Sequence, residues 1–325
     1  MSPAVSIVLP TFNRLEFLPA AVESVRAQTF SDWELIIADD GSDGATRDYL
    51  RTLHDGERIR VLWLEHSGRP AVARNAAIRA ARGAYVAFLD SDDLWLPDKL
   101  IRQMTSLQPH GHRHWSHTRF ALTDGSGRIV QHSPRGAHAA KSGWIWESLL
   151  TGETVIALPT VVVSRVILEQ LGGFDESFRM CEDNDLWLRL ATRSEIDAVP
   201  EPLTLVRRHD QHSGDDVTAW EDRLRIFEGL LREQAGSPCE SLIRSRCAAQ
   251  SAGLARSQAA SGMRMRALAT VLSSAPRCWR KLSWWPDALR ATIRACAPRP
   301  VVSFIRSRRH HRRTRAKMRC AADTA

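Results

Sequence analysis

The sequence predicts an α/β protein with a doubly wound, mostly parallel sheet, an adjoining α+β half and a basic, helical C-terminal extension. Short β-branched runs alternate with helix-like segments over the first hundred residues. The pattern becomes mixed from about residue 110 to 215, and from about 218 onward it is helical. With 325 residues, 43% of them hydrophobic, the chain can bury the core of one large unit with an appendage.

The changes in pattern predict the domain boundaries. We expect a two-part domain over 1–217, divided into halves at 1–108 and 109–217. A helical extension should cover 218–305, and a basic tail over 306–325 has no aromatic residue and is expected to be disordered.

The first half is predicted to alternate strands and helices. We expect strands over 5–10, 34–40, 59–65 and 84–90, with helices over 16–30, 44–54 and 69–83 between them. Helices of this length between strands imply right-handed crossovers and a parallel sheet. Ligands bind such sheets beyond the carboxyl ends of the strands, which is where Asp39, Asp40 and the acids from Asp90 onward fall.

The second half has shorter and less regular elements. Strands are expected over 114–124, 127–133 and 160–164, with turns at "DGSG" and "SPRG" and a helix that begins near Asp183. This texture is typical of an α+β half that packs beside the first.

The stretch "AYVAFLDSDDLW" ends an apolar strand with three carboxylates, those of Asp90, Asp92 and Asp93. Carboxylates this close together repel one another in a partly dry site, so they either take up protons or bind a cation. Oxygen ligands favour Mg²⁺ or Mn²⁺, held by carboxylates together with substrate phosphates. The alternative is that Asp93 caps the helix that starts near Pro97. Three acids at the end of one apolar strand favour a metal–diphosphate site.

Two further acidic motifs are open to both a functional and a structural interpretation. In "IIADDGSDG", Asp39 or Asp40 could accept hydrogen bonds from a base or ribose, or could belong to an ordinary Asp-Gly turn. In "GGFDESFRMCEDNDLWLRLA", Glu182 and Asp183 start a helix and are stabilised there by its dipole. Either carboxylate could also act as a general base toward a hydroxyl group.

A late histidine motif, "RRHDQHS", follows a predicted strand and contains His209 and His212. One imidazole could complete a cation site or contact a diphosphate, and a solvated loop histidine is equally compatible with the spacing.

These motifs, together with "VSIVLPTFNR" and "RNAAIRAARG" and in this order, resemble the bacterial family 2 glycosyltransferases over roughly residues 3–215. The family has the GT-A fold, in which a nucleotide-sugar-binding half, here 1–108, lies beside an acceptor half, here 109–217. The resemblance implies that Pro10 lines the nucleotide pocket, that Asp40, with Asp39 as its rival, holds the base, and that Arg74 lies near the base and phosphates. It also implies that Asp90 and Asp92 form the D-x-D motif and contact the metal, that Asp92 and Asp93 contact the ribose and diphosphate, and that His209 is a late metal or phosphate contact. Asp183, with Glu182 as the alternative, is implied to be the catalytic base.

The activity implied by the resemblance is transfer of a sugar, with inversion, from a nucleotide-diphosphate sugar to a hydroxyl group of a saccharide or lipid-linked acceptor. Mg²⁺ or Mn²⁺ would be the cofactor, and the context would be synthesis of lipopolysaccharide, capsule or exopolysaccharide. Processive members carry a Q-x-x-R-W motif and membrane spans, which this sequence lacks, so we expect one sugar per binding event. Trp144 and Trp146 could stack on an acceptor sugar, although such tryptophans more often belong to the core.

Two other functional classes share features with this sequence. A nucleotidyltransferase would also use acids on a similar sheet, but it would carry a Gly-rich loop with Lys or Arg after the first strand, where this chain has "PTFNRLEF". A nucleic-acid binder is suggested only by the basic tail.

The charge is divided unevenly along the chain. Beyond Glu240 there are 19 Lys and Arg residues against two acids, a net +17, so the total of +8 leaves −9 on the first 240 residues. Trp279, Trp284 and Trp285 lie among the arginines, a pattern suited to an anionic membrane surface. A simple helical cap is the second interpretation, and the acidic body argues against nucleic acid.

The expected location is the cytoplasm, with a peripheral position at the inner face of the membrane if the tail binds lipid. No window approaches the roughly 20 apolar residues of a membrane-spanning helix. The N-terminal segment is too short and too β-like for a signal peptide, and the six cysteines are scattered without a C-x-x-C pair.

Overall fold

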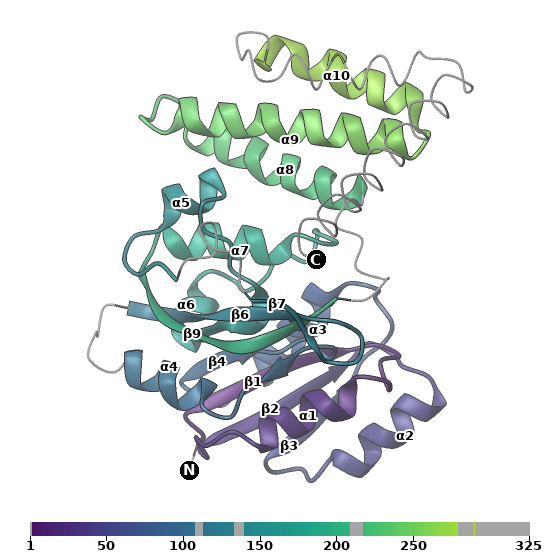
Figure 1. Cartoon of the computed structure of the whole chain (residues 1–325), viewed down its shortest axis with the longest axis vertical. Helices are drawn as coiled ribbons and strands as arrows, with labels where there is room; N and C mark the ends of the chain where they lie inside the picture. Colours follow the sequence, from purple (N-terminus) through teal and green to yellow (C-terminus); the bar gives the residue numbers. More distant parts are fainter. Residues whose placement is uncertain (1, 108–112, 133–139, 209–216, 279–288, 290–325) are drawn as a thin grey trace, which may run out of the picture. The chain divides into compact units, whose positions relative to one another are not determined.

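The computed structural model describes residues 2–107, 113–132, 140–208, 217–278 and 289 (Figure 1). The chain divides into two compact units, Met1–Gly214 and Asp215–Ala325. The first unit contains all the described strands and every predicted site residue that the structure describes.

The first half of this unit has the predicted α/β architecture. Its strands are β1 (Val5–Thr11), β2 (Trp33–Asp39), β3 (Ile59–Trp63) and β4 (Tyr85–Phe88), and its helices are α1 (Leu18–Arg26), α2 (Gly44–Leu53) and α3 (Pro70–Ala80). The strands pair in parallel in the order β3-β2-β1-β4. The four strands and three helices expected from the alternating pattern are confirmed.

The second half continues the same sheet. Its strands are β5 (Leu94–Trp95), β6 (Arg113–Thr123), β7 (Ile129–His132), β8 (Val161–Ser164) and β9 (Glu195–Arg207); its helical elements are α4 (Lys99–Leu107), α5 (Trp146–Thr151), the 3-10 helix η1 (Leu158–Thr160), α6 (Arg165–Gln170) and α7 (Glu182–Ala191). The sheet order runs on as β4-β8-β6-β9-β5, with β7 paired to β6. β8 is antiparallel to both β4 and β6, whereas β6 and β9 are parallel.

Helices cover both faces of the sheet, as a doubly wound fold requires. Alternate side chains of each strand point to opposite faces, so two separate apolar clusters form. One cluster joins the sheet to α1, α2 and α4, with Leu18, Leu50 and Leu100 fully buried. The other joins it to α3, α6 and α7 around Phe88 and Trp187.

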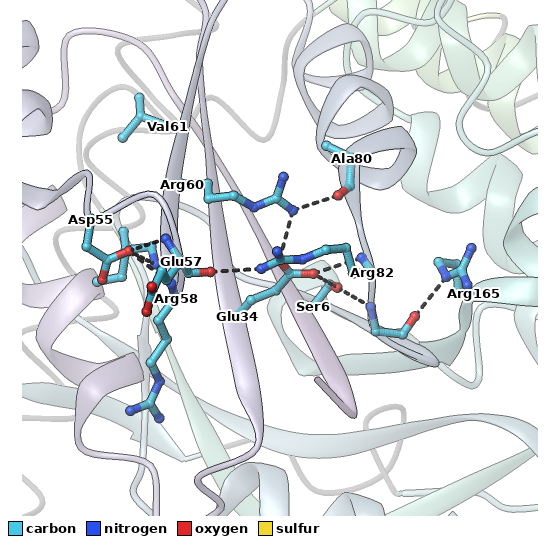
Figure 2. A network of polar contacts seen from close by, with 12 residues as sticks. Ser6, Glu34, Asp55, Glu57, Arg58, Arg60, Val61, Ala80, Arg82 and Arg165 are labelled. Atoms are coloured by element: carbon cyan, nitrogen blue, oxygen red, sulfur yellow. Dashed lines mark hydrogen bonds and ion pairs between the residues drawn. The ribbon is translucent and has the colours of Figure 1, made fainter. Parts of the chain in front are cut away.

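A polar network fixes the amino ends of the strands (Figure 2). Glu34 on β2 is buried and accepts hydrogen bonds from Ser6 Oγ at 2.7 Å, Arg60 Nη2 at 2.8 Å and Arg82 Nε at 2.9 Å. Burial alone would raise the pKa of Glu34, but these hydrogen bonds outweigh it and lower the pKa. The backbone N–H of Gly83 donates to Ser6 Oγ at 2.8 Å, so the network also ties the start of β4 to β1.

The two tryptophans before and in α5 have different environments. Trp146 packs against the cluster around α7, as the core interpretation predicted, whereas the side chain of Trp144 is 65% exposed.

The second unit is helical over its described residues, as predicted. It contains α8 (Val217–Glu233), α9 (Glu240–Ala260) and α10 (Arg264–Cys278), and α9 contacts both of the other helices. Close packing of α8 on α9 depends on Gly253, where a Cβ atom would lie 2.3 Å from the Trp220 ring. The tryptophans at 279, 284 and 285 and the tail over 306–325 lie outside the described residues. No helix in the described part of the chain has the length and apolar character needed to cross a bilayer.

Candidate functional site

The site residues gather where the order of the parallel strands reverses. β1 lies between β2 and β4, so the connections leave in opposite directions from this point. Open α/β sheets bind ligands in the crevice at the carboxyl ends of such strands. Pro10 pairs in register with Ala38 near the end of β1, and Asp90 follows β4 on the other side of β1.

The acidic cluster occupies the turn between β4 and β5. Asp93 is buried, and its Oδ1 accepts a hydrogen bond from the backbone N–H of Arg207 at 2.8 Å. Burial and the charges of Asp90 and Asp92 raise the pKa of Asp93 well above its usual value. Burial also raises the pKa of Asp90. The charge of Arg74 lowers this pKa, but it offsets only part of the rise, because the negative charge of Asp92 raises the pKa further.

Arg207, at the end of β9, holds the backbone of this turn. Its Nε donates to the carbonyl of Asp92 at 2.9 Å and its Nη1 to the carbonyl of Gly125 at 2.6 Å. Its guanidinium also lies 4.5 Å from the centre of the Phe17 ring. His209 was predicted as a site residue in this segment, whereas Arg207, whose only signal is its place in "RRHDQHS", was not.

Arg74 on α3 is the central cation of the site. Its side chain is buried, its Nη2 donates to Asp90 Oδ1 at 2.7 Å, and its Nη1 donates to Glu182 Oε1. Burial favours loss of the proton, but the charges of Asp90 and Glu182 prevail and raise the pKa of Arg74. Two carboxylates from different elements therefore share one guanidinium.

The first turn of α7 carries Glu182 and Asp183. Burial and the neighbouring charge of Glu182 raise the pKa of Asp183 to about 6, although hydrogen bonds from Asn184 and the charge of Arg74 oppose the shift. The Asn184 side chain donates to Asp183 Oδ1 at 2.8 Å. A carboxylate with a pKa near 6 is ionised at neutral pH and basic enough to accept a proton from a substrate.

The loop before α7 is anchored to α3. Asn75, next to Arg74, donates from Nδ2 to the carbonyl of Phe174 at 2.8 Å and accepts from its N–H at 2.9 Å. Gly173 has φ of +72° and passes so close to Asn75 that a Cβ atom would lie 2.6 Å from its Oδ1. Sequence reasoning missed Asn75, although it directly follows Arg74 in the "ARNAAI" segment.

Asp39 and Asp40 are both buried and already hydrogen-bonded. Asp40 accepts from the backbone N–H and the hydroxyl of Ser67 at 2.9 Å and from the Gly68 N–H at 2.9 Å, so it organises the loop before α3. Asp39 accepts from the Ser42 N–H at 3.2 Å. Their role toward a nucleotide base stays a prediction.

Phe12 follows the last residue of β1 and was not identified from the sequence as a separate site residue. Its side chain is 40% exposed, and its ring stacks on that of His66 with 4.1 Å between the ring centroids. An exposed aromatic face beside the carboxyl ends of the strands can stack on a base.

The predicted residues therefore fall into two groups. Arg74 joins Asp90 to Glu182, with Asp92, Asp93 and Asp183 close enough to interact electrostatically with members of that set. Pro10, Asp39 and Asp40 lie at the ends of the neighbouring strands. His209 and His212 lie outside the described residues.

The donor set fits a divalent cation. Mutual repulsion and burial raise the pKa of both Asp90 and Asp93, so the turn has more negative charge than it can easily hold. Among the residues that the structure describes, no group of three or more His, Cys, Asp or Glu side chains is arranged to hold a metal. A cation would thus depend on one or two carboxylates and on substrate phosphates, which is the usual pattern for Mg²⁺.

The sequence is similar to one described protein family and to several named proteins. The model of the family described as "Glycosyl transferase family 2" matches residues 6–162. The putative teichuronic acid biosynthesis glycosyltransferase TuaG of Bacillus subtilis is 36% identical over 190 residues, which are 58% of this chain and 72% of that protein. The glucosyltransferase WfgD of Escherichia coli, named for transfer from UDP-Glc to GlcNAc-diphosphoundecaprenol, is 32% identical over 60% of this chain and 72% of its own length.

Other relatives are longer. An uncharacterised glycosyltransferase of Rickettsia felis is 32% identical over 203 residues, and this chain spans only about a third (33%) of its length.

Solved structures confirm the fold. Staphylococcus aureus TarS 1–349 in complex with UDP-GlcNAc has a TM-score of 0.59 at 18% identity, over 91% of this chain and 82% of that one. The mannosyltransferase PcManGT of Pyrobaculum calidifontis, in complex with GDP-Man and Mn²⁺, has a TM-score of 0.56 at 16% identity, over 91% and 86%. At these identities the likeness shows the GT-A fold alone.

Proposed function

Because the chain belongs to glycosyl transferase family 2, we propose that it transfers one sugar, with inversion, from a nucleotide-diphosphate sugar to a hydroxyl group of a saccharide or lipid-linked acceptor. The observation that carries this proposal is Asp183, a carboxylate with its pKa raised to about 6, beside the Arg74–Glu182 pair that reaches the acidic turn. The proposed base, Asp183, is thus connected through Glu182 and Arg74 to the acidic turn that would face the leaving diphosphate.

The reaction is a single displacement. Asp183 accepts the proton of the acceptor hydroxyl, and the oxygen attacks the anomeric carbon from the face opposite the diphosphate. The bond between that carbon and the diphosphate oxygen breaks as the new glycosidic bond forms, so the configuration inverts. Asp183 is favoured over Glu182 because Glu182 is buried and paired with Arg74.

Asp90 and Asp92 would hold Mg²⁺ or Mn²⁺, and His209 stays a predicted further ligand. When bound, the ion acts as a Lewis acid that neutralises the charge growing on the leaving diphosphate. The complex of PcManGT with GDP-Man and Mn²⁺ supports divalent metal use on this fold.

The printed names of the relatives support a role in cell-surface polysaccharide synthesis. WfgD is named for a diphosphoundecaprenol-linked acceptor and TuaG for teichuronic acid. We therefore place the acceptor among lipid-linked or free saccharides of lipopolysaccharide, capsule or exopolysaccharide. Phe12, with Asp39 or Asp40 and Pro10, would form the base pocket.

A donor panel tests the proposal. The protein is incubated with UDP-, GDP- and dTDP-sugars and Mn²⁺, and binding is followed as thermal stabilisation and by calorimetry. We expect saturable binding of one sugar nucleotide that EDTA abolishes. Binding of duplex DNA without affinity for any nucleotide sugar, or nucleotidyl transfer from a nucleoside triphosphate, would each replace this proposal with one of the other two classes.

Asp92→Ala tests the metal site. Loss of a carboxylate that holds the ion should abolish the Mn²⁺-dependent part of donor binding while the protein remains folded. Calorimetric titration of the donor with and without Mn²⁺ gives the answer, and circular dichroism is the folding control. Unchanged affinity for the donor in Mn²⁺ would remove Asp92 from the site.

We also propose that the second unit brings the protein to the inner face of an anionic membrane. Met265 and Leu272, seven residues apart on one face of α10, are 77% and 64% exposed. Arg266 is exposed on the same helix, and the region beyond Glu240 is strongly basic. Apolar and basic side chains side by side are suited to an anionic lipid surface.

A further inference from the structure

Arg74 connects two parts of the site that come from distant parts of the sequence. It lies on α3, whereas Asp90 follows β4 and Glu182 begins α7. Its Nη2 is 2.7 Å from Asp90 Oδ1, and its Nη1 contacts Glu182 Oε1. The Arg74 side chain is 7% exposed and so is that of Glu182. One buried cation therefore neutralises a carboxylate on the donor side and a carboxylate next to the base.

The surroundings of Arg74 fix it in this bridging position. Its guanidinium lies 5.6 Å from the centre of the Phe174 ring, and the next residue, Asn75, holds the backbone of Phe174 through two hydrogen bonds. Both terminal nitrogens of Arg74 already donate to carboxylates. Arg74 is therefore placed to connect α3, α7 and the acidic turn, and its terminal nitrogens point at carboxylates and not at a phosphate site.

We propose that Arg74 is a positioning residue that ties the first turn of α7, and with it Asp183, to the acidic turn that faces the donor. This inference rests on the proposed function, because it gives Arg74 a part in the same transfer reaction. Arginine suits the task since its planar fork donates to two carboxylates in fixed directions, which the single ammonium group of lysine cannot do. A base displaced by about 1 Å from its productive position loses about 100-fold in rate.

The charges of Arg74 and Glu182 give a second, independent way to test this positioning role, because both act on the pKa of Asp183. The charge of Glu182 raises the pKa of Asp183, and the charge of Arg74 lowers it. Without Arg74, the carboxylate of Glu182 is no longer compensated, so Asp183 should gain its proton at higher pH. Removing the charge of Glu182 as well should reverse that change.

The test compares four variants of the full chain: Arg74→Met, Arg74→Lys, the double variant Arg74→Met with Glu182→Gln, and the matched control Arg60→Met. Arg60 is a sound control because it also donates to a buried carboxylate, Glu34 at 2.8 Å, and to the carbonyl of Ala80 on α3 at 2.7 Å. Arg60 is the second residue of β3, so this contact, drawn in Figure 2, lies at the amino ends of the strands, whereas the candidate site lies at their carboxyl ends. Both arginine-to-methionine variants should lose stability.

The kinetic results should separate Arg74 from its control. In Arg74→Met, kcat should fall about 100-fold while the KM for the donor changes less than about threefold. The acid limb of kcat should move to higher pH, and in the double variant it should move back. In Arg74→Lys, the acid limb of kcat should return to its wild-type pH, but kcat should stay about 10-fold below the wild-type value. Arg60→Met should leave the limb where it is in the wild type.

Hydrogen exchange gives a measurement that needs no activity. The amides of α7 over 182–190 should exchange faster in Arg74→Met and at the wild-type rate in Arg60→Met. Wild-type exchange at α7 in Arg74→Met would overturn the inference, and so would a raised donor KM with unchanged kcat, which would make Arg74 a donor contact. If the wild type transfers no sugar, the proposed function fails, and the exchange data still decide the role of Arg74.

Discussion

Asp183 and Glu182 are neighbours on the first turn of α7, yet their carboxylates have different environments. Glu182 is buried against Arg74, whereas Asp183 is partly exposed and hydrogen-bonded by Asn184. One oxygen of Glu182 already accepts a hydrogen bond from the buried Arg74 guanidinium, so this carboxylate is less available to a substrate hydroxyl group. The two acids thus differ in environment, and the choice of Asp183 as the base stays a prediction.

Asp183→Asn tests the assignment of the base. The variant should bind the donor normally and lose transfer by about 10²- to 10⁴-fold, because the amide cannot accept the proton. Transfer rate and donor affinity are measured on the same preparation. Asp185→Asn is the control, since Asp185 lies on the same turn but pairs with Arg189 at 2.7 Å. Near-normal turnover in Asp183→Asn would move the base to another residue, with Glu182 first.

The pH dependence follows from the raised pKa of Asp183. The carboxyl must lose its proton to act, so kcat should rise with pH through about 6 and level off above it. Asn184→Ala removes a hydrogen-bond donor that stabilises the ionised Asp183 carboxylate, so the acid limb of kcat should move to higher pH. The profile is measured from pH 4.5 to 8 at saturating donor. A limb that is absent from this range, or that moves to lower pH in Asn184→Ala, would contradict the assignment.

At the residue scale, the acids at the ends of strong patterns were visible in the sequence, whereas their pairing partners were not. Arg74 was expected near the base and phosphates and not as a partner of these acids. "DSDD" and "ED" are visible because each adjoins an apolar strand or helix. Their partners are distant in the chain: Arg74 and Glu182 are 108 residues apart, and Asp93 and Arg207 are 114 apart. Pairings over such separations depend on the whole sheet, so no local spacing predicts them.

At the scale of elements, the strands of the first half were predictable with their approximate bounds, whereas β9 was expected only as a strand of undefined length before "RRHDQHS". The first strands are short, mostly apolar runs that contain β-branched residues, whereas β9 contains Pro200, Pro202 and several charges. It is a strand because it pairs with β6 along its length, with register shifts near Arg119. A proline-containing sequence of this kind needs a partner strand before its conformation is defined.

Gly83 sets how closely the chain between α3 and β4 approaches β1. A Cβ atom at this position would lie 2.6 Å from the backbone nitrogen of Ser6. Gly83→Ala should therefore lower the free energy of unfolding by about 1–3 kcal/mol, since the backbone must shift to relieve the contact. Urea unfolding followed by circular dichroism measures the change.

The matched control is Gly44→Ala in α2, where a Cβ atom would meet nothing within 4 Å. That variant should be neutral or more stable by up to about 1 kcal/mol, because alanine favours a helix over glycine. Equal destabilisation by both substitutions would contradict the close-approach argument.

At the scale of the whole molecule, the sequence indicated a change near residue 217, and the contacts divide the chain between 214 and 215. The change to a helical pattern indicated this boundary, since the charge changes only later, beyond Glu240. It did not reveal that both halves of the first unit share one sheet, which holds all nine of the described strands. Sheet continuity depends on β8, a four-residue strand that pairs with a strand from each half.

Membrane association is testable on the intact chain. The double variant Met265→Asp and Leu272→Asp should sediment several-fold less with anionic vesicles than the wild type, because it loses apolar contact and gains negative charge. Binding of the wild type should weaken with salt and be absent on neutral vesicles. Val166→Asp, at an exposed valine of α6, is the control. Undiminished sedimentation of the double variant would show that α10 is not the anchor.

The position of β8 has a consequence for how substrate choice can change in this protein. β8 is hydrogen-bonded to β4 on one side and to β6 on the other, so the two halves of the first unit share one continuous sheet. Rearrangement around a substrate should then come from the loops that connect the strands at the edge of the sheet. On the proposed function, exchanging those connections for the ones of a relative should alter which acceptor receives the sugar and leave the choice of nucleotide as it was.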